Sequence, residues 1–248
     1  MSKLIKYEFR KTMFTKWIIL GITGVAEILY LLGLYLDKNT LMGLSMALLT
    51  LLAFGGVLVI GLQSVVTLHR DMNTRQSYML FMTPNSSYKI LGAKVIENGL
   101  SILVAGGFFF ALGALDITLL FAKQSSLKEL WDTIAQIIHA FNQDVEINAQ
   151  SLACLMAAML TGWIATVTAA YLADAVSSAL LNGKKGNFLV SFAFFIVLYV
   201  LMTYVEQKFA TLVNGVNAGF LVQSVISLLF AAVMYFATAK IMEDKLSV

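Results

Sequence analysis

The side chains that most often do chemistry in proteins are scarce in this chain. It has two histidines, His69 and His139, and one cysteine, Cys154, at no spacing typical of a metal site. With so few histidines no Ser-His-Asp triad can be assembled from the sequence. A GxxxxGK[ST] phosphate loop is also absent, so the chain has no ATP site of the usual kind. These features predict a chain that is not an enzyme and holds no metal or cofactor of its own.

Four carboxylates lie inside long apolar runs, at Glu27, Glu97, Asp116 and Asp174. A charge at the centre of a bilayer costs a few kcal/mol or more and usually has a partner or a function. Glu97 is one turn from Lys94, so an interfacial ion pair is expected there, and Asp116 is expected to be in contact with water near the outer end of its run. Two interpretations stay open for Glu27: a structural contact with a neighbouring helix or a cavity, or a place on a translocation path.

The composition indicates that lipid surrounds most of the chain. Hydrophobic residues make up 59% of the 248 residues, the mean hydropathy is +0.83, and charged residues, at 12%, have about half their usual share. A spanning helix needs about 20 mostly apolar residues. Six runs meet this requirement: 17–36, 43–68, 95–121, 149–181, 188–205 and 218–239. The predicted fold is therefore all-α, a polytopic membrane protein with six transmembrane helices in a single transmembrane domain over residues 1–248.

The basic residues predict the orientation of these spans, because Lys and Arg accumulate on the cytoplasmic side of a membrane. With six spans, the two termini lie on the same side as the 69–94 and 182–187 loops. The opposite side holds only four of the 17 Lys and Arg residues, Lys38, Lys123, Lys128 and Lys208. We therefore expect a multi-pass protein of a bacterial-type cell membrane with both termini in the cytoplasm.

Two further segments are amphipathic without being long enough and apolar enough to span. Residues 1–16 alternate basic and apolar side chains and predict an interfacial helix on the inner leaflet. Residues 123–148, outside the membrane, carry apolar side chains at helical spacing, among them Trp131 and Phe141. This outer segment either rests on the membrane surface or forms a lid over an exit path, with Trp131 and Phe141 as its anchors.

The cytoplasmic loop 69–94 is unusually long and polar for this chain and includes its single proline. Its first part can form a short helix before Pro84, since a proline disfavours helix in the residue before it. An exposed apolar cluster rimmed by charge indicates a docking surface; a helix lying flat on the inner leaflet is the alternative. The candidate partner-binding residues are Arg70, Asp71, Arg75, Tyr78, Met79, Phe81, Met82 and Pro84.

The same stretch, "RDMNTRQSYMLFMTPNSSYKILGAK", resembles the loop between spans two and three of ABC-2 type (type V) ABC exporter permeases. In those proteins charged residues precede a core of the form "lLF.tP.s", and "il.gK" leads into span three. The topology of the whole chain is similar to that family, although the specific motif covers only residues 70–94. Two departures are the long outer segment 123–148 and a region before span six without an obvious re-entrant hairpin.

The resemblance implies a non-catalytic permease with an N-terminal amphipathic helix and a cytoplasmic coupling helix. A separate nucleotide-binding subunit would bind ATP and Mg²⁺, and a second membrane subunit, identical or homologous, would complete the path. The exported substrate would be amphiphilic: a peptide, an antibiotic or a lipid-like molecule. No nucleic-acid partner is expected.

Two other function classes stay open on the sequence alone. A non-transporting membrane scaffold or sensor would need only the docking loop and the outer segment. A proton-coupled secondary transporter would use a carboxylate inside a span, such as Glu27, but the two halves of the chain have no evident repeat.

The first prediction concerns the orientation. In a chain whose native Cys154 is replaced by serine, single cysteines at Ser126 and Asn214 should react with a membrane-impermeant maleimide on intact cells. A cysteine at Asn73 should react only after the membrane is permeabilised. Labelling of Asn73→Cys on intact cells would contradict the predicted orientation.

Overall fold

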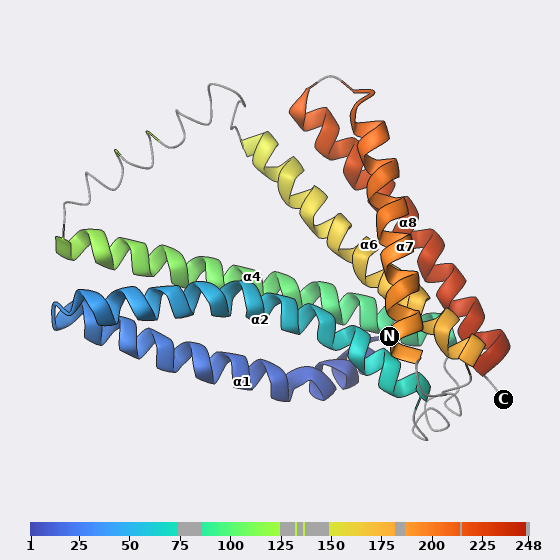
Figure 1. Cartoon of the computed structure of the whole chain (residues 1–248), viewed down its shortest axis with the longest axis horizontal. Coiled ribbons are helices and arrows are strands. Elements are labelled where there is room, and N and C mark those ends of the chain that lie inside the picture. Colours follow the sequence, from blue (N-terminus) through green and yellow to red (C-terminus); the bar gives the residue numbers. More distant parts are fainter. Residues whose placement is uncertain are drawn as a thin grey trace. The chain divides into compact units, whose positions relative to one another are not determined.

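The computed structural model describes residues 1–73, 86–124, 132, 136, 149–181, 187–213 and 215–246, and no strand occurs in these ranges. The helices are α1 (Ser2–Tyr35), α2 (Asn39–Asn73), α4 (Ser87–Gln124), α6 (Ala149–Leu181), α7 (Asn187–Ala210) and α8 (Val216–Leu246) (Figure 1). Each of the six is long and apolar enough to cross a membrane. The predicted all-α architecture with six candidate spans is therefore confirmed.

The helices extend beyond the apolar runs that predicted them. Residues 2–16 are helical, but they belong to the same uninterrupted helix as the first span, because no Gly or Pro precedes Gly21. A separate interfacial helix is thus not seen, and the contact of this segment with a membrane surface stays a prediction. Helix α6 passes Asp174 without a break.

The loop expected at 69–94 is shorter in the structure. Residues 69–73 belong to α2, and α4 begins at Ser87. The backbone carbonyl of Ser86 accepts hydrogen bonds from the amides of Lys89 and Ile90, so Ser86 occupies the N-cap position that serine favours. The candidate residues Arg75, Tyr78, Met79, Phe81, Met82 and Pro84 lie outside the described residues, as do Trp131 and Phe141 of the outer segment.

The chain divides into two compact units. Unit 1 consists of Met1–Ile5, Ser64–Gly99 and Val145–Val248, and unit 2 of Lys6–Gln63 and Leu100–Asp144. In unit 1, α6 packs against both α7 and α8. Small side chains on α6 are fully buried at four-residue spacing, at Ala165, Ala169 and Ala173. Small residues at this spacing let helix backbones approach closely in lipid.

Unit 2 contains α1 from Lys6 onward, the first part of α2 and the second part of α4. Its buried core is small and is centred on Ala26, Tyr30 and Leu49. The turn between α1 and α2 is tight: Asp37 adopts a left-handed backbone conformation with a φ of 52°, and a Cβ at Gly33 would lie 2.7 Å from the backbone nitrogen of Met42. Glycine at position 33 therefore permits this approach of the two helices.

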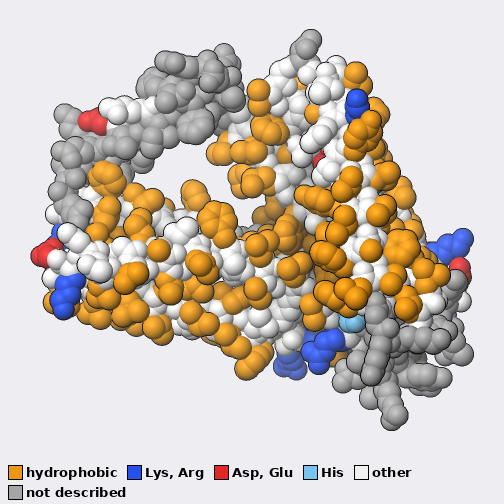
Figure 2. Space-filling model, viewed as in Figure 1, with side chains coloured by type: hydrophobic (Ala, Val, Ile, Leu, Met, Phe, Trp, Pro, Cys, Tyr) orange, Lys and Arg blue, Asp and Glu red, His pale blue; other side chains and the backbone are white. Residues whose placement is uncertain are grey.

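The surfaces of the helices are mainly apolar. Hydrophobic side chains cover most of the described helices on the face drawn in Figure 2. Large examples are almost fully exposed, including Phe54 at 73% and Phe110 at 79%. Exposing so many apolar side chains to water is unfavourable, whereas contact with the hydrocarbon of lipids is not. The exposed surfaces are therefore those of a multi-pass membrane protein.

Candidate functional site

The first candidate site lies in unit 1, where a buried ion pair joins the helices that flank segment 74–85. Nζ of Lys94 on α4 lies 2.8 Å from Oδ2 of Asp71 on α2, and the two side chains are 0% and 5% exposed. Lysine is almost never fully buried unless it is paired. Removing one partner of such a pair leaves an uncompensated charge and costs roughly 3–5 kcal/mol. The ion pair therefore fixes the end of α2 to the start of α4.

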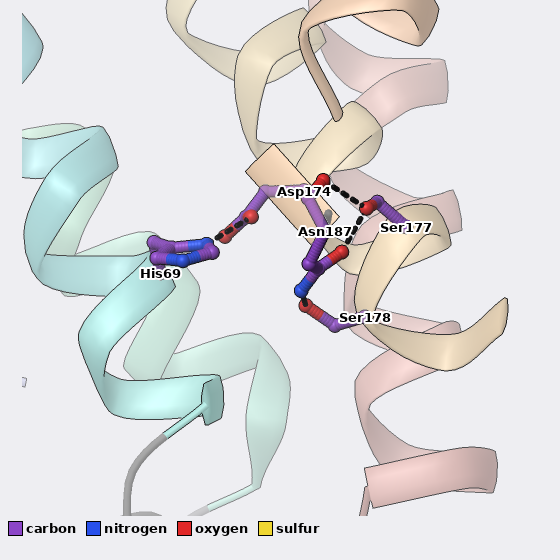
Figure 3. A network of polar contacts seen from close by, with 5 residues as sticks. All are labelled: His69, Asp174, Ser177, Ser178 and Asn187. Carbon is purple, nitrogen blue, oxygen red and sulfur yellow. Dashed lines mark hydrogen bonds and ion pairs between the residues drawn. The ribbon is translucent and has the colours of Figure 1, made fainter. Parts of the chain in front are cut away.

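A second polar contact joins α2 to α6. Nδ1 of His69 lies 2.6 Å from Oδ1 of Asp174, whose side chain is buried, while the imidazole is partly exposed (Figure 3). The other carboxylate oxygen of Asp174, Oδ2, is buried and has no hydrogen-bond partner among the described residues. Oδ1 of Asp174 therefore contacts His69, whereas Oδ2 has no donor among the described residues.

The same part of α6 is connected to the start of α7. The hydroxyl of Ser177 donates to the backbone carbonyl of Asn187 at 2.7 Å and also contacts its side-chain oxygen (Figure 3). The side-chain nitrogen of Asn187 donates to Ser178 Oγ at 3.1 Å. These contacts lie on either side of segment 182–186. Both segments that were predicted to face the cytoplasm with the termini are therefore flanked by buried polar contacts.

Further hydrogen bonds connect α2, α4, α6 and α8 within unit 1. The Ser64 and Tyr171 hydroxyls are hydrogen bonded, which joins α2 to α6. Trp163 Nε1 donates to Asn98 Oδ1 at 3.0 Å, and the Tyr235 hydroxyl donates to the Tyr88 carbonyl at 2.6 Å. The adjacent apolar core is formed by Leu68, Met72, Leu91, Val167, Tyr171, Ala175, Ala239 and Met242. Hydrogen bonds and apolar packing therefore both join these helices within unit 1.

The second candidate site lies in unit 2 and contains Glu27. The carboxyl group of Glu27 on α1 interacts directly with that of Asp116 on α4. Asp116 is 5% exposed, so the structure corrects the expectation that it is in contact with water. The reason is the packing around it: Tyr30, itself fully buried, donates its hydroxyl hydrogen to the backbone carbonyl of Asp116 at 2.8 Å. Two carboxyl groups this close cannot easily both be ionised.

The interactions that these residues form are ion pairs and hydrogen bonds between helices. No group of three or more His, Cys, Asp or Glu side chains that could hold a metal ion is found within the described ranges. Of the predicted docking residues, Arg70 is exposed at the end of α2, whereas Asp71, expected on the rim of the same surface, is buried in the ion pair with Lys94. Glu97 is also buried.

Two of these contacts were not expected from the sequence. His69 was considered only as a metal ligand, and Asp71 only as a surface charge. One signal could have indicated the first contact: the predicted topology places His69 and Asp174 near the same side of the membrane. The second contact depends on the register between α2 and α4, which brings Asp71 to Lys94. Nothing in a single sequence indicates that register.

Comparisons of the chain with models of protein families, with curated proteins and with solved structures found no significant match.

The second prediction concerns the contribution of the Lys94–Asp71 ion pair to the stability of the protein. Lys94→Met should destabilise the protein by roughly 3–5 kcal/mol, because it removes the buried ammonium group that is paired with the buried Asp71 carboxylate. The double variant Asp71→Leu/Lys94→Met should recover most of that loss, since a buried pair replaced by apolar side chains is often neutral. The thermal unfolding midpoint of the purified protein measures both effects.

Lys89→Met is the matched control, because Lys89 is an exposed lysine on the same helix. It should leave the midpoint nearly unchanged. If the double variant unfolds at as low a temperature as Lys94→Met, the ion pair is not the reason for the loss.

Proposed function

We propose that this chain is the membrane-spanning permease subunit of an ATP-driven exporter of the ABC-2 (type V) kind. The observation that carries the proposal is the buried Lys94–Asp71 ion pair, which joins the helices on either side of segment 74–85. That segment contains "LFMTP", the core of the motif that resembles the family. A loop whose two flanking helices are fixed to each other can pass a displacement to both of them together.

In this proposal segment 74–85 is the coupling helix, and an ATPase subunit binds it. Tyr78, Met79 and Phe81 are the apolar anchors, because a few buried aromatic and apolar side chains dominate the affinity of most protein interfaces. Arg70 and Arg75 lie at the rim, where charges contribute to orientation and association rate more than to affinity. The partner binds ATP with Mg²⁺ and supplies all of the catalysis.

The remaining parts of the proposal follow from this role. A second membrane subunit, identical or homologous, completes the path for an amphiphilic substrate, and Glu27 lies on that path. Both termini face the cytoplasm of a bacterial-type cell, in agreement with the distribution of Lys and Arg. The outer segment, with Trp131 and Phe141, covers the exit.

One observation favours a second candidate function. A carboxyl pair inside candidate spans, such as Glu27 and Asp116, is typical of proton relays in transporters. A proton-coupled secondary transporter would use this pair and would need no ATPase. A membrane scaffold or sensor, the third class, would need neither the carboxyl pair nor an ATPase. Co-purification of an ATPase separates the first class from the other two.

The third prediction tests the docking surface. The wild-type full chain, purified in mild detergent, should bring with it a Mg²⁺-dependent ATPase activity. Tyr78→Ala/Phe81→Ala should lose it, because truncation of a central anchor costs about 2 kcal/mol or more, roughly 30-fold in affinity for each. The measurement is the ATPase activity that co-elutes per mole of the chain.

Tyr204→Ala/Phe209→Ala is the matched control, because it removes the same two residue types from exposed positions on α7. This variant should keep the activity. If the full ATPase activity still co-elutes with the Tyr78→Ala/Phe81→Ala variant, the coupling role of segment 74–85 is excluded.

A further inference from the structure

Unit 2 contains two carboxylate oxygens that lack any hydrogen-bond donor. Oε2 of Glu27 and Oδ1 of Asp116 are both buried, and neither has a partner among the described residues. The two side chains interact directly with each other, and Asp116 is 95% buried. A buried polar atom without a partner costs free energy, and a buried carboxylate without a cation costs more.

The neighbouring donors of unit 2 are already used elsewhere. The Tyr30 hydroxyl donates to the backbone carbonyl of Asp116 rather than to its carboxylate. The Thr50 hydroxyl donates to the Met46 carbonyl at 2.9 Å within α2. Neither of these two hydroxyls is therefore available as a donor to the two carboxylate oxygens.

The nearest lysine in the sequence of α4 is also engaged. Nζ of Lys123 lies 2.6 Å from Oδ1 of Asp37 and also donates to the backbone carbonyl of Leu34. These contacts hold Lys123 at the end of α4, two helical turns beyond Asp116. Lys123 is therefore not the cation that neutralises the pair.

A cavity of about 200 Å³ adjoins Asp116. Its wall is formed mainly by apolar side chains of α2 and α4, namely Met46, Leu49, Ala53, Phe109, Leu112 and Ile117. Binding sites for small molecules combine such apolar walls with a few polar groups that fix the orientation of the ligand. Here the polar group is a carboxylate, so the complementary ligand is a cation with a hydrocarbon part.

We propose that Glu27 and Asp116 bind the primary ammonium group of a cationic amphiphile, whose hydrocarbon part occupies this cavity. A primary ammonium offers three N–H donors, enough to satisfy both carboxylate oxygens. A quaternary ammonium carries the same charge but has no N–H donor. If the chain has the proposed function, this ligand is the exported substrate. The binding site itself does not require an ATPase partner.

The fourth prediction measures binding directly. Tritiated dodecylamine should bind saturably to the purified full chain in phosphatidylcholine nanodiscs, above the background of empty nanodiscs. Dodecyltrimethylammonium should compete about tenfold or more weakly, because hydrogen bonds to charged groups are worth roughly 1.5–3 kcal/mol. Asp116→Asn and Glu27→Gln should each weaken the binding of dodecylamine at least about tenfold for the same reason.

Asp37→Asn is the matched control for the loss of a carboxylate. Asp37 is an exposed residue of unit 2, and asparagine tolerates its left-handed backbone conformation. It should bind dodecylamine as the wild type does.

A second variant tests the cavity without removing a charge. Gly113 lines the cavity, and a Cβ there would meet no atom within 4 Å, so Gly113→Leu fills the space rather than displacing the backbone. It should abolish binding. Gly21→Leu, at an equally open glycine of α1 outside this cavity, should not.

Several outcomes would overturn the proposal. One is saturable binding that Asp116→Asn and Glu27→Gln leave unchanged, and another is equal competition by the quaternary ammonium. Dodecylamine that fails to bind a folded, monodisperse wild-type chain would restrict the carboxyl pair to a proton or an inorganic cation. Because the assay contains no ATPase, each of these results can be told apart from a failure of the proposed function.

Discussion

A charged side chain in apolar surroundings must be neutralised by a partner, and this constraint determines how the helix ends of unit 1 are held together. Lys94 is fully buried and is paired with Asp71 of another helix. His69 and Asp174 form a similar contact between α2 and α6. Exposed side chains on these helices are largely apolar, whereas a buried ion pair can specify the register of two helices. We infer that the polar contacts determine the alignment of these helices.

The position of these contacts relative to segments 74–85 and 182–186 bears on how a partner could act on the helices. Asp71 lies three residues before segment 74–85 and Asn187 directly follows segment 182–186, whereas Lys94 and Asp174 lie two to three helical turns from these segments. A partner that pushes on segment 74–85 would act on α2 and α4 together, and through His69 and Asp174 on α6. In unit 2, Oε2 of Glu27 and Oδ1 of Asp116 have no hydrogen-bond partner among the described residues. We propose that a cationic ligand neutralises them.

The sequence predicted the six candidate spans because the length of an apolar run is a local property. It did not indicate where the helices end: residues 69–73 and 87–94 were assigned to the segment between two spans, and they are helical in the structure. In the structure Asp71 and Lys94 are buried because they neutralise each other, and that depends on the register of two helices distant in sequence. Asp116 was likewise expected in water, but its side chain is buried at 5% exposure.

The central claim is that segment 74–85 is where an ATP-hydrolysing partner binds, and photocrosslinking in living cells tests it most directly. A photoreactive phenylalanine analogue at Tyr78 should form a covalent product with a protein that carries a GxxxxGK[ST] phosphate loop. The same analogue at the exposed Tyr204 of α7 should not. Mass spectrometry of the products identifies the partner. Products with lipid alone at Tyr78 would contradict the account and would mean that this segment lies on the inner leaflet.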